Sequence, residues 1–125
     1  MGASYRVLII DDDPSTRFVY RQVLDVLGLS LDEAGSGDEA IRVLSEQAPD
    51  LVVLDMLLPG TPGTAVLSYI YSQPHLANTS VLIITAHQSW PDLALRNRDR
   101  LLYKPVSPRN MRQAARDVLQ LPPTG

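Results

Sequence analysis

Carboxylate, hydroxyl and ammonium groups stand directly after four short aliphatic segments of this chain. In chain order they belong to Asp11–Asp13, Asp55, Thr85 and Lys104. Carboxylates gathered in one place repel each other, which raises a pKa or demands a cation. A hard divalent ion resolves that repulsion, and Mg²⁺ takes few carboxylates while keeping several waters. If the aliphatic segments end side by side, the acidic groups predict a Mg²⁺ site.

The remaining two groups suit an anionic ligand, because Thr85 offers a hydroxyl and Lys104 an ammonium. A cation, a hydroxyl and an ammonium around one carboxylate form an arrangement for phosphoryl transfer, in which positioning and charge neutralisation carry most of the chemistry. Taken singly, an Asp after a strand is usually a turn residue or a helix cap. Four such groups after four strands favour a shared site.

The alternation of aliphatic and helix-like segments predicts how these groups are positioned. We expect strands at Tyr5–Ile10, Leu29–Ala34, Leu51–Leu54, Val81–Ile84 and Leu101–Tyr103. We expect helices at Ser15–Leu27, from Asp38 to about Gln47, from Thr64 to about Gln73, weakly within 89–96, and at Pro108–Leu119. Strands alternating with helices imply a parallel sheet covered on both faces, with the ligand site beyond the carboxyl ends of the strands.

Two local expectations concern the first two helices. Asp38 is expected to cap the second helix. The helical spacing of apolar residues predicts a buried face on the first helix, made of Phe18, Val19, Val23, Val26 and Leu27.

Length and composition indicate one globular domain. The chain has 125 residues, of which 45% are hydrophobic and 20% charged. It has no cysteine, which excludes disulfides and thiolate metal sites. No aliphatic run is long enough to span a bilayer, and no signal-peptide pattern is present. We expect a cytoplasmic protein with no membrane contact, a domain over residues 1–120, and a linker or tail over 121–125.

Charge is distributed unevenly along the chain. Residues 1–95 carry four Arg against twelve Asp or Glu, whereas residues 96–125 carry seven Lys or Arg against two Asp. This pattern arises either from chance arrangement on solvated faces or from a basic surface that meets a partner. Seven cations without interleaved aromatic residues do not favour direct nucleic-acid binding.

The sequence resembles the receiver domain of two-component response regulators over about residues 5–120. The matching pieces are Val7–Pro14, Asp50–Pro59 with Gly63, Ile84–Ala86 and Lys104–Pro105. Each piece is weak alone, but in this order they are highly specific. The resemblance implies an α/β, flavodoxin-like (βα)5 fold, a doubly wound five-stranded parallel sheet of order 2-1-3-4-5.

The resemblance also implies a phosphoryl-accepting signalling switch rather than an enzyme. Asp55 would take the phosphoryl group from a sensor histidine kinase or a histidine phosphotransfer protein. Thr85 would bind a phosphoryl oxygen, and Lys104 would pair with the phosphate. The peptide bond before Pro105 is typically cis in this family.

The same resemblance implies a Mg²⁺ site. Its ligands would be Asp11, Asp12, Asp55 and the backbone carbonyl of Leu57. Asp13 sits at a position that varies in the family and is left outside the metal shell.

The segment between Thr85 and Lys104 departs from the family pattern. The family usually has an aromatic residue three positions before the lysine, where this chain has Leu101. Tyr103 is expected to point to the other face of the strand. The segment is about one helical turn short, and its helix is expected to start at Pro91 and to be brief. Contact with a second copy or an output domain is expected within 88–116, by a mode that the resemblance does not fix.

His87, two residues after Thr85, is read either as a solvated loop residue or as a group that positions water or a partner.

Two other functions remain open at this point. The run Asp11–Ser15 fits the Asp-x-Asp-x-Thr/Ser pattern of haloacid-dehalogenase-like phosphatases. Against it, only Asp117 supplies a carboxylate after Lys104, and the chain is short for that fold. The second alternative is a receiver-like interaction module that does not use phosphate. Turnover of a generic phosphatase substrate would indicate the enzyme, and failure to bind Mg²⁺ and acyl phosphate would indicate the module.

Overall fold

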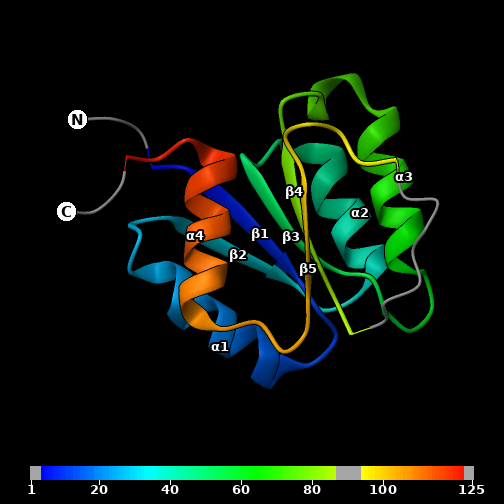
Figure 1. The fold of residues 1–125 in the computed structure, drawn as a ribbon. Coiled ribbons are helices and arrows are strands. Elements are labelled where there is room, and N and C mark those ends of the chain that lie inside the picture. The colour runs from blue at the N-terminus through cyan, green and yellow to red at the C-terminus, as the bar shows by residue number, and fades with distance from the viewer. Residues whose placement is uncertain (1–3, 87–93, 123–125) are drawn as a thin grey trace.

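A single parallel sheet forms the centre of the molecule. The computed structural model describes residues 4–86 and 94–122 (Figure 1). Within these residues the strands are β1 (Arg6–Ile10), β2 (Ser30–Ala34), β3 (Leu51–Asp55), β4 (Ser80–Thr85) and β5 (Arg100–Tyr103). They are all parallel, in the order β2-β1-β3-β4-β5. The predicted flavodoxin-like α/β fold and its strand order are confirmed.

Helices cover both faces of this sheet. The described residues contain α1 (Pro14–Asp25), α2 (Gly37–Glu46), α3 (Gly63–Ser72) and α4 (Pro108–Leu119). A 3₁₀ turn that the sequence analysis did not anticipate, η1, spans Pro74–Leu76. Figure 1 shows α2 and α3 on one face and α1 and α4 on the other. The helix expected within 89–96 falls mostly outside the described residues, and residues 94–99 form turn and irregular backbone.

The strands alternate their side chains between two apolar clusters. Val52 and Leu54 of β3 pack with residues of α2 and α3, whereas Val53 packs with residues of α1 and α4. All five residues of β3 are buried, as expected for an inner parallel strand that is covered on both faces. Burial of these uniformly aliphatic strands drives the two helical layers onto the sheet.

The buried face of α1 differs from the predicted one. Phe18, Val19 and Val26 are exposed, while Tyr20 and Leu24 are buried. Val23 and Leu27, which were also predicted for this face, are partly buried and pack against the core, so the prediction is correct for these two residues. Arg17 binds polar groups at the sheet edge, which apolar spacing along the helix does not predict.

The cap of α2 was also predicted wrongly. Ser36, not Asp38, is the N-cap, and its hydroxyl oxygen accepts a hydrogen bond from the N–H of Glu39 at 3.1 Å. Asp38 lies one residue inside the helix, in the first turn. Its carboxylate there interacts favourably with the positive end of the helix dipole, and it accepts a hydrogen bond from the hydroxyl of Thr61.

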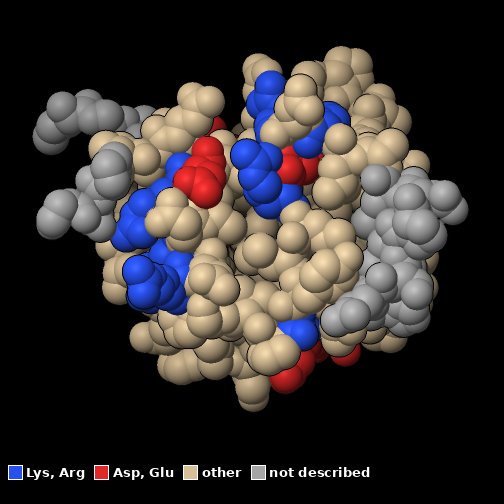
Figure 2. Space-filling model, viewed as in Figure 1, with Lys and Arg blue, Asp and Glu red and all other residues tan. Residues whose placement is uncertain are grey.

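Basic residues gather on one side of the fold. Lys and Arg atoms lie beside α4 and near the start of β5 on the face seen in Figure 2. Arg109, Arg112 and Arg116 belong to α4, and Arg98 and Arg100 lie at the start of β5. The basic residues within 96–125 therefore map to the α4 and β5 side of the sheet.

Candidate functional site

The register of the sheet brings four predicted positions to one edge. Ile10 of β1 pairs with Leu54 of β3, so the next residues, Asp11 and Asp55, lie side by side at the ends of these strands. Asp55 pairs with Ile84, one residue before Thr85. The N–H of Lys104 donates to the carbonyl of Thr85 at 2.9 Å, immediately after β5. Parallel strands place their carboxyl ends together, and here the ends of β1, β3, β4 and β5 carry polar side chains.

Asp11 is buried and is held through nearly all of its polar atoms. Its side chain is 2% exposed. Its N–H donates to the carbonyl of Ala34 at 3.2 Å, and its Oδ1 accepts from the N–H of Asp13 at 2.9 Å. Its Oδ2 is buried without a hydrogen-bond partner. The hydrogen bond to Oδ1 therefore orients the carboxylate, while Oδ2 remains able to bind a ligand.

Asp55, the last residue of β3, is oriented from two sides. Its Oδ1 accepts from the N–H of Leu57 at 2.9 Å. Its Oδ2 lies 3.2 Å from the Nζ of Lys104. The same Nζ lies 3.7 Å from the Oδ2 of Asp11. One ammonium thus serves two buried carboxylates.

The electrostatics of this cluster show an imbalance. Burial, with the nearby Asp55 carboxylate, raises the pKa of Asp11 above its usual value, although the N–H of Asp13 and the ammonium of Lys104 act in the other direction. Burial acts to lower the pKa of Lys104, but the carboxylates, Asp55 first, outweigh it and raise that pKa. The cluster therefore has more negative charge than Lys104 alone offsets.

The residues present fit a divalent cation. Asp11, Asp12 and Asp55 each offer a carboxylate oxygen, and these oxygens lie within 4.8 Å of one another. The Oδ2 of Asp11 accepts no hydrogen bond and has only the ammonium of Lys104 near it, at 3.7 Å, so it can serve as a ligand to a cation. Oxygen-only ligands of this kind suit Mg²⁺. The carbonyl of Leu57 stays a predicted ligand.

Asp13, by contrast, caps a helix. It is the N-cap of α1, where its side chain accepts from the N–H of Ser15 at 3.0 Å and from the hydroxyl of Thr16 at 2.8 Å. These hydrogen bonds, Thr16 first, lower the pKa of Asp13. Both of its oxygens are engaged locally, which agrees with its exclusion from the metal shell.

The end of β4 and β5 completes the site and corrects one expectation. Thr85 is fully buried and pairs in register with Tyr103. Leu101 packs with the cluster of α2 and α3, whereas Leu102 packs with that of α1 and α4. Because side chains alternate along a strand, Tyr103 shares the face of Leu101, and the expectation that it points to the other face is wrong. The peptide bond between Lys104 and Pro105 is cis, as predicted, and His87 lies outside the described residues.

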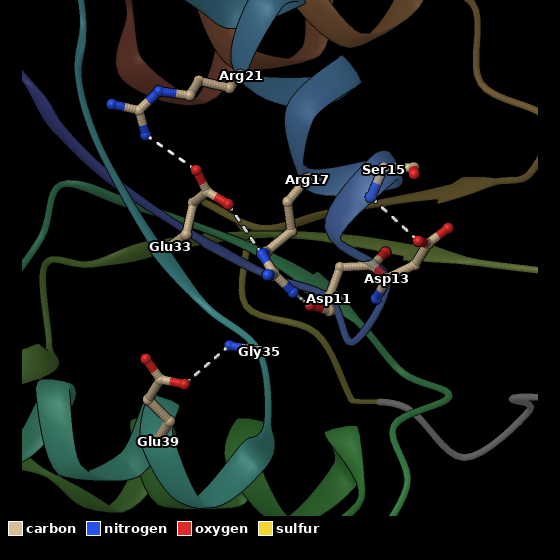
Figure 3. A network of polar contacts seen from close by, with 8 residues as sticks. All are labelled: Asp11, Asp13, Ser15, Arg17, Arg21, Glu33, Gly35 and Glu39. Carbon is tan, nitrogen blue, oxygen red and sulfur yellow. Dashed lines mark hydrogen bonds and ion pairs between the residues drawn. The ribbon is translucent and has the colours of Figure 1, made fainter.

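Two residues that the sequence analysis did not single out border the site. Arg17 of α1 donates from Nη1 to the carbonyl of Asp11 at 2.6 Å and from Nε to Glu33 of β2 at 2.8 Å (Figure 3). Arg17 stands six residues after Asp11, within the next helix. An arginine side chain at that spacing is long enough to contact the loop that precedes its helix. This spacing is the feature of the sequence that could have predicted the contact.

A polar cleft lies at the opposite edge of the sheet. It has a volume of about 380 Å³ and is lined by Tyr5, Asp50, Ser80, Arg100 and Asp117, among others. Asp117 lies in the last turn of α4, and the other four lie at or before the amino ends of strands. The cleft therefore contains none of the predicted site residues. Among the described residues, no helix combines the length and the apolar character needed to cross a bilayer.

Comparison with known families gives one match, which covers most of the chain. The model of the response regulator receiver domain matches residues 7–116. Within these bounds lie the acidic cluster, Thr85 and Lys104.

Curated relatives agree with this match. The chain is 32% identical over 117 residues to the transcriptional regulatory protein AfsQ1 of Streptomyces coelicolor, covering 91% of this chain and 51% of that protein. It is 30% identical over 109 residues to the DNA-binding response regulator MtrA of Mycolicibacterium smegmatis, covering 85% of this chain and 46% of that protein. The chain spans about half the length of the curated relatives it matches.

Solved structures share the fold. The signal receiver domain of a LuxO repressor protein from Vibrio parahaemolyticus aligns with a TM-score of 0.83 at 28% identity, covering 94% of this chain and 92% of that one. The receiver domain of a sensor histidine kinase from Pseudomonas aeruginosa aligns with a TM-score of 0.84 at 22% identity, covering 94% and 99%. That domain was crystallised with a magnesium ion coordinated in its active site cleft.

Proposed function

The chain belongs to the response regulator receiver domain family, and on that premise we propose that it is a switch whose Asp55 accepts a phosphoryl group. A receiver domain is a two-component signalling module rather than an enzyme. The observation that carries the proposal is the setting of Asp55. One of its oxygens is held by the N–H of Leu57, and the other faces Lys104 at 3.2 Å beside a second buried carboxylate.

In the proposed reaction, an oxygen of Asp55 attacks the phosphorus atom of a phosphohistidine. The new O–P bond forms as the P–N bond breaks, and its electron pair returns to the imidazole of the donor. Lys104 pairs with the phosphoryl oxygens, and the hydroxyl of Thr85 donates to one of them. These groups stabilise charge on the transferred phosphoryl group, which is where such transfers gain most of their rate.

We propose Mg²⁺ as the cofactor, held by Asp11, Asp12, Asp55 and the carbonyl of Leu57. When bound, it would supply positive charge to the phosphoryl oxygens and offset the carboxylate repulsion. Mg²⁺ binds only the folded chain at this site, so it should raise the thermal unfolding midpoint. Asp12→Asn should remove that increase, whereas Asp13→Asn, a matched change at a helix cap, should keep it. Coincident melts with and without Mg²⁺ in the wild-type chain would exclude the metal site.

Incubation with acetyl phosphate and Mg²⁺ tests the acceptor. Intact-mass measurement should show the addition of one phosphoryl group to the wild-type chain and to Asp13→Asn, and none to Asp55→Asn. Labelling that persists in Asp55→Asn would move the acceptor to the Asp11–Asp13 run and revive the phosphatase alternative.

Family membership implies a histidine kinase partner. We propose a sensor histidine kinase or a histidine phosphotransfer protein as the donor, in the cytoplasm. We propose contact with a second copy or an output domain within 88–116, of which the structure describes residues 94–116, including β5 and most of α4. We further propose a receiver domain over 1–120 and a linker or tail over 121–125, because α4 ends at Leu119 and Gln120 is its C-cap.

A further inference from the structure

The side chain of Arg17 extends from α1 towards the sheet edge beside the acidic cluster (Figure 3). Its Nη1 donates to the backbone carbonyl of Asp11 at 2.6 Å, and its Nε donates to the Oε1 of Glu33 at 2.8 Å. The side chain is only 17% exposed. A guanidinium binds two acceptors at once in a fixed geometry, so the carbonyl of Asp11 is tied to β2 through one rigid group.

Glu33 is in turn anchored from a second direction. Its Oε2 accepts from the Nη1 of Arg21 at 3.2 Å, and its backbone pairs with Ile9 in the sheet. Gly35 leaves room for the guanidinium, since a Cβ at that position would lie 3.2 Å from the Nη1 of Arg17. Glu33 is therefore held in place on β2, and it holds the guanidinium of Arg17 in turn.

This tie fixes the peptide from which the two acidic side chains leave. The carbonyl of Asp11 and the N–H of Asp12 belong to one planar group, so a hydrogen bond to the carbonyl sets the plane for both residues. Asp11 is already held at its N–H and at Oδ1, and Arg17 adds the carbonyl. With these three contacts, the direction of Oδ2 has little freedom left.

We propose that Arg17 is a positioning residue for the cation site: it holds the Asp11–Asp12 peptide so that both carboxylates face one divalent ion. This inference rests on the Mg²⁺ site proposed above. Among the described residues, Arg17 binds the acidic cluster through the backbone carbonyl of Asp11 and through none of its carboxylates. Partners that orient ligands in this way typically change metal affinity about 10–100-fold when they are lost.

Arg21 supplies a matched control. It shares Glu33 with Arg17 and carries the same charge on the same helix, but within the described residues it binds Glu33 and not Asp11. A role in holding α1 against β2 would be weakened by either substitution. A role in orienting the acidic pair would be lost only with Arg17. Methionine is the test residue at both positions, because it keeps an unbranched stem and removes the guanidinium.

The experiment measures Mg²⁺ affinity without any phosphoryl donor, from backbone amide shifts of Asp11–Asp13 in the folded protein. Arg17→Met should weaken Mg²⁺ binding about tenfold or more, and Arg21→Met should leave it at the wild-type value. Arg17→Lys should restore part of the affinity, because an ammonium reaches one of the two acceptors but not both. Amide spectra recorded without Mg²⁺ establish that each variant is folded.

Equal Mg²⁺ affinity in the wild-type chain and in Arg17→Met would overturn the positioning role while leaving the metal site intact. An equal loss in Arg17→Met and Arg21→Met would reduce Arg17 to a structural residue. Absence of Mg²⁺ binding in the wild-type chain itself would overturn the proposed site and this inference together.

Discussion

The Nζ atom of Lys104 lies 3.2 Å from the Oδ2 atom of Asp55, from the end of β5 to the end of β3. In the chain without phosphate, this ammonium is the cation that offsets the two buried carboxylates of the site. The side chain of Lys104 is 29% exposed, so water screens part of the interaction. On phosphorylation of Asp55, the ammonium of Lys104 would therefore pair with the phosphoryl group instead of the carboxylate, without having to enter the site.

Lys104→Met should destabilise the chain at neutral pH. Removing one partner leaves Asp11 and Asp55 buried without their cation, which we expect to cost about 1–3 kcal/mol, below the value for a fully buried pair. Mg²⁺ should recover more stability in the variant than in the wild-type chain, because it offsets the same carboxylates. Urea unfolding with and without Mg²⁺ measures both effects, with Arg109→Met as the control for loss of an exposed charge. A larger loss in Arg109→Met than in Lys104→Met would contradict the prediction.

Gly63→Ala should disturb the site by displacing the backbone of Asp55 and Met56. A Cβ at Gly63 would lie 2.5 Å from the Cα of Met56 and 2.8 Å from the carbonyl oxygen of Asp55. Backbone must move to accept it, so we expect a loss of about 1–3 kcal/mol and slower labelling by acetyl phosphate. Gly28→Ala is the control, because its φ of +73° makes alanine strained while no atom lies within 4 Å of the added Cβ. That variant should lose about 1 kcal/mol and label at the wild-type rate.

Strand ends were the part of the site that the sequence predicted best. Uniform aliphatic segments define inner parallel strands, and a parallel sheet puts their carboxyl ends at one edge whatever the loops do. Asp11, Asp55 and Lys104 could therefore be placed together before any coordinates were known. The helix predicted at Pro108–Leu119 has the bounds of α4, where Ser107 is the N-cap and Pro108 the first helical residue.

Features that depend on tertiary contacts were missed. The guanidinium of Arg17 binds Asp11 and Glu33, a pairing across two strands that spacing along one helix does not show. The face of Tyr103 was misassigned although strand alternation alone gives it. Asp99 is buried, which the sequence analysis did not predict.

Asp99 closes a polar network between α3, β4 and the segment before β5. Its Oδ1 accepts from the N–H of Val81 at 2.7 Å, and its Oδ2 accepts from the hydroxyl of Tyr71 and from the Nε of Arg96 at 3.0 Å. The guanidinium of Arg96 also stacks on the ring of Tyr71, 4.3 Å from its centre. A buried carboxylate is tolerated here because each of its oxygens is paired.

Tyr71→Phe should remove a pH-dependent part of the stability. Burial and the Asp99 carboxylate raise the pKa of Tyr71 from 10.0 to about 12. Since the folded chain holds this proton more tightly, the hydroxyl contributes fully below pH 10 and its contribution is lost as the pH rises from 10 to 12. At neutral pH we expect the variant to be less stable by about 1 kcal/mol, with the difference shrinking across that range. Urea unfolding against pH measures this, and Tyr103→Phe should show no such convergence with the wild-type chain.

If Thr85 moves towards a phosphoryl group on Asp55, as our proposal implies, a neighbouring side chain must fill the space that it leaves. Leu101 is partly buried and already packs with the core cluster of α2 and α3. Tyr103, on the same face and in register with Thr85, is 43% exposed. A small aliphatic side chain follows the threonine with little rearrangement, whereas a large ring would have to move between two positions.

We therefore predict a weak conformational response that Leu101→Tyr strengthens. Phosphorylation adds nearly two negative charges and several acceptor oxygens at Asp55, and beryllofluoride with Mg²⁺ serves as its mimic. Backbone amide shifts in the wild-type chain should change strongly near Asp55, Thr85 and Lys104 and only slightly over 94–103, because a small energy difference between two states gives a small population shift. In Leu101→Tyr the changes over 94–103 should grow, while Tyr103→Leu should match the wild-type chain. Large changes over 94–103 in the wild-type chain would contradict the prediction, and their disappearance in Tyr103→Leu would identify Tyr103 as the aromatic residue that responds.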